Sequence, residues 1–76
     1  MIFLVQKNRG VYEPLRVINV MHIAVIRQTN SGTYIYSLYD GDEFELQLSI
    51  RDFVNVLSDS KKVVTIGSYE FCSFRL

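Results

Sequence analysis

The chain has 76 residues, 49% of them apolar, and its eight Lys and Arg residues balance eight Asp and Glu residues. This length predicts one small domain, residues 1–76, that buries only roughly 60% of its unfolded surface, so a homodimer that buries more is a reasonable expectation. Zero net charge argues against an electrostatic field that draws nucleic acid to the whole surface.

The cysteine content and the first ten residues indicate the cellular compartment in which the protein is expected. Cys72 is the only cysteine, so an internal disulfide cannot form and a reducing compartment is favoured. The start MIFLVQKNRG lacks the charge-first, longer apolar pattern of a signal peptide. No apolar run approaches the roughly 18 residues of a membrane span. We therefore expect a cytoplasmic protein with no membrane partner.

The charges are divided unevenly along the chain. Residues 1–39 carry four bases against one acid, a net charge of +3, and residues 40–76 carry four bases against seven acids, a net charge of −3. Charged faces exposed to solvent are the simpler interpretation, and a partner oriented by the asymmetry is the alternative.

Two strand-forming stretches open the chain. Residues 2–6 read as a β-strand broken by KNRG, and residues 11–28 are rich in β-branched side chains, which predicts one long strand or two short ones. Because apolar residues occupy both alternating positions of residues 11–28, we expect this segment to be central in a sheet and covered on both faces.

The sequence YIYSLYDGDEFELQL, residues 34–48, predicts a β-hairpin. A two-residue turn would set apolar residues beside acids, whereas a three-residue loop, residues 39–41, pairs Tyr36 with Phe44 on one face. It also pairs Leu38 with Asp42 and Tyr34 with Leu46. This loop places Gly41 where a type I turn with a G1 bulge needs a positive φ. We expect the aromatic face under a helix, rather than stacked on nucleic-acid bases.

The acids of this hairpin, Asp40, Asp42, Glu43 and Glu45, raise the question of a metal site. Calcium takes six to eight oxygen ligands, and these acids lack the spacing of a calcium-binding loop. We therefore interpret them as a hairpin tip and one solvated strand face, with metal binding as the less favoured alternative.

One α-helix is predicted near residues 50–58, in the sequence SIRDFVNVLSD. Ser49 is a suitable N-cap, and Asp52 occupies the capping-box position. Apolar residues at the i, i+3, i+4 and i+7 spacing predict a stripe that packs on the sheet. The stripe consists of Ile50, Phe53, Val54 and Leu57.

Two further strands, KVVTI and YEFCSF, follow the helix and predict a hairpin through Gly67 and Ser68. The order of several strands, one helix and two strands predicts an α+β fold with a mainly antiparallel sheet of about five to six strands.

No self-sufficient catalytic motif is present. Cys72 and His22 are the one cysteine and the one histidine, and each lies in an apolar strand sequence where half-buried packing is expected. A cysteine nucleophile needs an adjacent, oriented base, and a zinc site needs more Cys and His ligands than two. We expect no enzymatic activity, no metal and no cofactor.

This order of elements resembles the LytTR DNA-binding domain of bacterial response regulators over residues 14–71. The similar stretches are PLRVINVMHIAV, then TYIYSLYDGDEFELQLSIRDFVNVL with its D-G turn and Ser-capped helix, and then VVTIGSYEF. The resemblance implies a mainly β fold and a transcriptional regulator that binds double-stranded DNA.

The chain departs from the family pattern at two places. Where the family carries a basic His-Arg pair before Ser-Tyr, this chain has Ile66 and Gly67, and keeps only Ser68 and Tyr69. The family's acidic residue after the first β run corresponds to Ala24 or its neighbours. Glycine has no side chain to contact phosphates or bases.

The resemblance leaves one other set of candidate DNA contacts. The loop RQTNSG corresponds to a loop that the family inserts into DNA, and it offers donors for base edges and phosphates. The candidates are Arg27, Gln28 and Asn30, with Lys61 and Lys62 as additional phosphate contacts. The alternative function is a protein-interaction module, an accessory protein or phage-type inhibitor, which zero net charge and the missing His-Arg pair favour.

Overall fold

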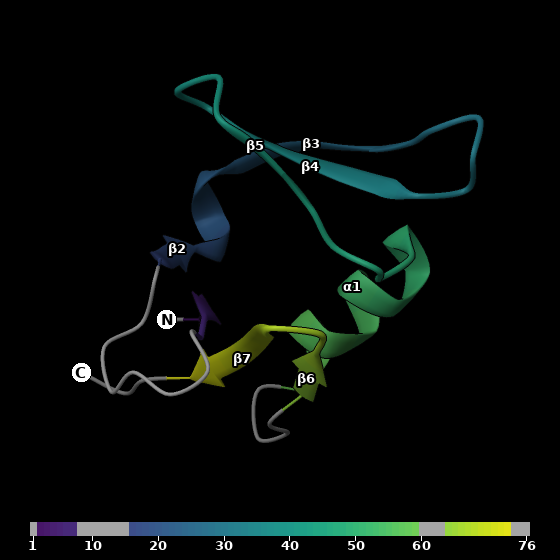
Figure 1. The fold of residues 1–76 in the computed structure, drawn as a ribbon. Coiled ribbons are helices and arrows are strands. Elements are labelled where there is room, and N and C mark those ends of the chain that lie inside the picture. The colour runs from purple at the N-terminus through teal and green to yellow at the C-terminus, as the bar shows by residue number, and fades with distance from the viewer. Residues whose placement is uncertain (1, 8–15, 60–63, 74–76) are drawn as a thin grey trace.

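The computed structural model describes residues 2–7, 16–59 and 64–73 of the chain. They form an α+β fold with seven strands in two antiparallel sheets and one α-helix, which confirms the expected class (Figure 1). The strands divide between two sheets, of four and three strands, where a single sheet of five to six strands was expected. The elements are β1 (Ile2–Gln6), β2 (Arg16–Asn19), the 3-10 helix η1 (Val20–His22), β3 (Ile23–Gln28), β4 (Tyr34–Leu38), β5 (Glu43–Glu45), α1 (Ile50–Ser58), β6 (Val64–Ile66) and β7 (Tyr69–Ser73).

The four-stranded sheet, in the order β2-β1-β7-β6, joins the two ends of the chain. β1 has the predicted bounds, and its Leu4 lies opposite Phe71 of β7. β6 and β7 form the predicted hairpin, and Gly67 in its turn has a φ of 58°. The pairing of β1 with β7, by contrast, joins residues that are almost a chain length apart.

The described part of residues 11–28 does not form the predicted central strand covered on both faces. β2 is an edge strand of the four-stranded sheet and β3 is an edge strand of the three-stranded sheet, whose order is β3-β4-β5. The cause is η1, where the Asn19 side chain accepts from the Met21 N–H and turns the chain from one sheet to the other. A bulge between Ile23 and Val25 shifts the side-chain alternation again. Apolar residues at both alternating positions therefore belong to two half-exposed strands.

The β4–β5 hairpin has the predicted register. Tyr36 lies opposite Phe44, and Leu38 exchanges backbone hydrogen bonds with Asp42 and Gly41 at 2.8 and 3.0 Å. Gly41 has a φ of 92°, as the bulged loop requires. The register was therefore correctly inferred from the alternation of the arms and the position of one glycine.

The helix begins where it was predicted but turns a different face to the core. The Ser49 hydroxyl accepts from the Asp52 N–H at 3.1 Å, which caps the first turn. Phe53 is buried, whereas Ile50 and Val54 of the predicted stripe are 47% and 54% exposed. Val56 and Leu57 pack on the core together with Phe53, so the buried stripe is 53, 56 and 57. No helix in the described ranges is long and apolar enough to cross a membrane.

The core lies where the two sheets and α1 meet, and aromatic rings connect all three. Tyr36 stacks on Phe44 and meets the edge of Phe53, both at 5.4 Å between ring centroids. Phe44 contacts Tyr69 at 5.5 Å, and Phe53 contacts Phe71 at 6.2 Å. The Tyr36 hydroxyl donates to the Leu48 carbonyl at 2.6 Å, and burial raises the pKa of Tyr36 to about 12. The aromatic face of the hairpin is core, as predicted.

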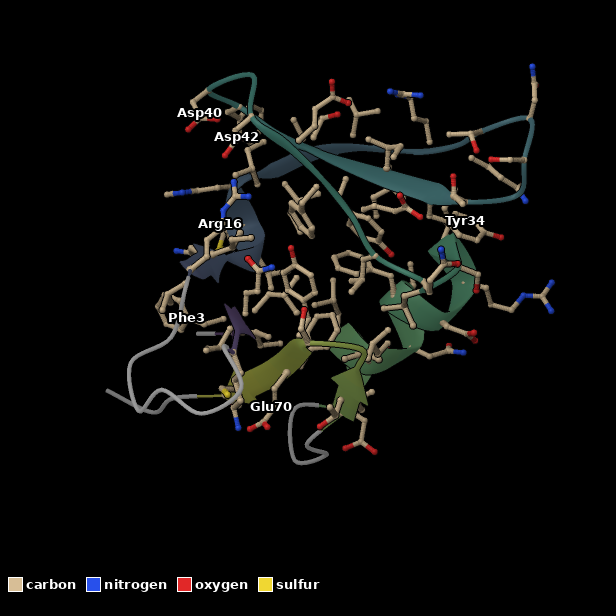
Figure 2. The ribbon with its side chains drawn as sticks, in the orientation of Figure 1. Phe3, Arg16, Tyr34, Asp40, Asp42 and Glu70 are labelled. Atoms are coloured by element: carbon tan, nitrogen blue, oxygen red, sulfur yellow. The ribbon has the colours of Figure 1, made fainter. Side chains whose placement is uncertain are left out.

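Within the described part of the chain, three ion pairs join bases of the first half to acids of the second half. They are Lys7–Glu70, Arg16–Asp42 and Arg27–Glu43. Arg16 on β2 lies next to Asp42 of the hairpin tip (Figure 2). The Arg16 guanidinium lies 5.6 Å from the centre of the Phe44 ring. Part of the charge asymmetry is thus used within the fold, and the Arg16–Asp42 pair links the two sheets.

Candidate functional site

The hairpin acids serve the turn, as the sequence indicated. The Asp40 carboxylate accepts from the Asp42 N–H at 2.9 Å, and Asp42 accepts from the Glu43 N–H at 2.9 Å and pairs with Arg16. Glu43 and Glu45 are exposed on the outer face of the sheet. Within the described residues, no three His, Cys, Asp or Glu side chains are grouped so that they could hold a metal ion.

The cysteine and the histidine occupy different settings. His22 is exposed in η1, which corrects the expectation of half-buried strand packing, because the strand breaks there into a 3-10 turn. Cys72 is half-buried in β7, as expected. Burial, and then the neighbouring Glu70 carboxylate, raise the pKa of the Cys72 thiol. A raised pKa keeps the thiol protonated at neutral pH, and the thiolate is the nucleophilic form.

The candidate DNA contacts of the RQTNSG loop gather at one end of the three-stranded sheet. Arg27 and Gln28 end β3, and Asn30 lies in the connection to β4, where Thr29 donates to the Thr33 carbonyl at 2.8 Å. Arg27, Gln28 and Asn30 are all exposed. Lys61 and Lys62 lie outside the described residues.

The Arg27 guanidinium is engaged within the sheet. It donates to the Glu43 carboxylate at 3.2 Å, and the Ser37 hydroxyl donates to the same carboxylate at 3.3 Å. Glu45 lies on the same face of the sheet as Arg27, because both residues are paired with Ile35 of β4. The Glu45 side chain is exposed there. Two acids, Glu43 and Glu45, therefore lie on the sheet face that carries Arg27.

An apolar groove of about 630 Å³ lies between η1, β3 and α1, and its rim includes large side chains open to solvent. Met21 is 78% exposed, Val25 is 53% exposed and Ile50 is 47% exposed. Among the described residues that line the groove, none is charged or carries a polar side chain. The lining residues are Ile2, Val20, Met21, Ile23, Ala24, Val25, Ile26, Ile50, Phe53 and Leu57.

The sequence reasoning missed this groove. Its residues come from four elements that meet only in the folded chain, and Ile50 was assigned to the buried stripe of the helix. One feature of the sequence did indicate surplus apolar surface. Residues 11–28 carry apolar side chains at both alternating positions, more than one covered strand face needs.

Comparison with known proteins gave no matching family model, no matching curated protein and no matching solved structure.

Proposed function

We propose that this chain is a protein-interaction module that binds an apolar segment of a partner in the groove between η1, β3 and α1. The observation that carries the proposal is the convergence of Met21, Val25 and Ile50 on one uncharged groove while all three remain about half exposed or more. Contiguous apolar surface of this kind is characteristic of interaction sites.

The chemistry of the lining supports a protein partner over a polar metabolite. Small-molecule sites place a few polar groups among apolar ones to orient the ligand, and none of the described residues that line the groove has a polar side chain. Burying apolar area contributes roughly 25 cal/mol per Å², without directional requirements. A groove built this way selects apolar side chains by shape.

The test is selection from a random peptide library displayed on phage, with the immobilised chain as target. We expect enrichment of apolar sequences, and binding at least about tenfold weaker for Met21→Asp, since a buried Met contributes roughly 1.5–3 kcal/mol. Tyr39→Asp is the matched control because Tyr39 is also 78% exposed but lies outside the groove. No enrichment by a chain that is monomeric in solution, or equal losses in both variants, would refute the proposal.

DNA binding through the loop after β3 is the second candidate. It is favoured by the exposure of Arg27, Gln28 and Asn30 around one loop, and by the resemblance to LytTR domains. The ion pair of Arg27 with Glu43 weighs against it. With about three charges, from Arg27, Lys61 and Lys62, log K would fall against log salt with a slope of about −2.7.

Fluorescence anisotropy with mixed-sequence duplexes at low salt tests this candidate. Arg27→Ala should weaken binding and reduce the salt slope by about one, whereas Arg51→Ala, an equal change of charge on α1, should not. Absence of binding at low salt would remove the candidate.

A further inference from the structure

The edge of β3 beside the groove offers backbone hydrogen-bonding groups. In an antiparallel pair, neighbouring residues point their N–H and C=O groups alternately toward and away from the partner strand. Thr29 donates to Thr33 across the pair, so Arg27 and Val25 also point toward β4. Ile26 therefore points its N–H and C=O away from β4, toward the open edge.

The hairpin on the other side of β4 leads to the same assignment. The Leu38 N–H donates to the Asp42 carbonyl, and the Leu46 N–H donates to the Tyr34 carbonyl, both toward β5. By alternation, Tyr36 also points its backbone groups toward β5. Ile26 lies opposite Tyr36 and has no backbone partner in β4. Among the described strands, β3 has no neighbour on its other side.

The usual protections of an edge strand are weak in this part of β3. Natural edges are guarded by charges, prolines and bulges. The stretch from Val25 to Gln28 keeps a regular register, contains no proline, and carries one charge, that of Arg27, which Glu43 neutralises. The bulge at Ala24 distorts only the start of the strand.

We propose that the occupant of this surface is a second copy of the chain, whose β3 pairs antiparallel with β3 of the first copy across a twofold axis. This inference rests on the proposed function and names the partner of the same groove. The two three-stranded sheets become one continuous six-stranded sheet. Because a twofold contact uses the same surface on both copies, one pairing covers both grooves.

Charge decides the register of the pairing. An axis at Arg27 would set the two guanidinium groups directly opposite each other, which is unfavourable. An axis at Ile26 sets Arg27 opposite Val25 of the other copy and lets the two Ile26 residues exchange backbone hydrogen bonds. Ile26 already lines the groove, so each Ile26 side chain lies against the groove of the other copy.

The size of the chain favours this occupant. Ten residues of the described part form the buried core, and the chain has no disulfide that could replace core. Small domains with such cores commonly gain stability by oligomerisation. Dimerisation through β3 buries Met21 and Val25, which are 78% and 53% exposed in the single chain.

Sedimentation equilibrium over a wide concentration range tests the dimer and its register together. The wild-type chain should dimerise. Val25→Lys places like charges opposite Arg27 twice per dimer and should weaken association at least about tenfold. Val25→Glu loses the same apolar side chain but places a carboxylate opposite the same guanidinium, so it should associate more tightly than Val25→Lys. Val17→Lys is the matched control, since Val17 is 54% exposed on β2, outside the groove, and should leave the dimer unchanged.

The outcomes separate this inference from the proposed function. A chain that stays monomeric but still selects apolar peptides overturns the dimer and leaves the interaction module standing. A dimer weakened equally by Val25→Lys and Val25→Glu overturns the β3 register. A dimer insensitive to both changes places the contact elsewhere and also overturns the inference.

Discussion

The two sheets of this molecule are assembled in opposite ways. The three-stranded sheet, β3-β4-β5, joins strands that are consecutive in the chain, and the four-stranded sheet pairs β1 with β7 from opposite ends of it. Turns set the register of the first sheet and of the β6–β7 hairpin in the second, whereas the pairing of β1 with β7 depends on tertiary packing. The comparison shows two different roles. The sheet of consecutive strands keeps an apolar edge at β3, while the four-stranded sheet brings the two ends of the chain together.

The largest expected effect comes from truncating one fully buried side chain in each sheet. Tyr36 and Leu4 are both 0% exposed. Tyr36→Ala should cost about 4 kcal/mol of unfolding free energy and Leu4→Ala about 3 kcal/mol, because each leaves a cavity. Denaturant unfolding measures both losses.

Folding kinetics on the same variants sharpen the comparison. Local contacts form at a smaller entropic cost than distant ones, so Tyr36→Ala should mainly slow folding and Leu4→Ala should mainly speed unfolding. Tyr36→Phe, which removes only the hydrogen bond to Leu48, is the milder variant if the alanine variant does not fold. The reverse kinetic pattern would contradict an early three-stranded sheet.

A smaller effect is expected from the turn that sets the local register. Gly41 has a φ of 92°, and a Cβ added there would meet nothing within 4 Å. Gly41→Ala should therefore cost about 1–2 kcal/mol through backbone conformation alone. D-alanine at position 41, introduced by chemical synthesis, favours positive φ and should restore the stability. Equal losses with both alanines would show that space, rather than φ, limits this position.

The smallest expected effect lies in the four-stranded sheet, where Lys7 donates to Glu70 at 2.6 Å. The hydrogen bond and charge of Lys7 lower the pKa of Glu70 below 4.5, and Glu70 raises the pKa of Lys7 above 10.5. The stabilisation is present between these values. It is lost as pH falls through the lowered pKa of Glu70, and again as pH rises through the raised pKa of Lys7.

Thermal unfolding as a function of pH tests this pair. The stability lost by the wild type below pH 4.5 should be reduced in Glu70→Gln. Glu45→Gln makes the same change of charge at an exposed position of the other sheet and should keep the acid-induced loss. Identical pH profiles for the wild type and Glu70→Gln would show that the pair contributes nothing measurable.

The candidate site was only partly predictable. The exposure of Arg27, Gln28 and Asn30 follows from their polar loop sequence. The pairing of Arg27 with Glu43 requires the register of three strands, because the two residues meet diagonally across β4. The groove requires the packing of β1, η1, β3 and α1 together, so the double alternation of residues 11–28 indicated surplus apolar side chains but not where they gather.

The sequence by itself determined the structures that form between near neighbours. The hairpin around Gly41, the Ser49 cap and the turn at Gly67 each depend on contacts within a few residues, where backbone φ and side-chain alternation decide the outcome. The tertiary structure decided how residues 16–28 divide between the sheets, which face of α1 is buried and where apolar surface remains open. Those outcomes depend on distant packing partners, whose positions a local pattern does not encode.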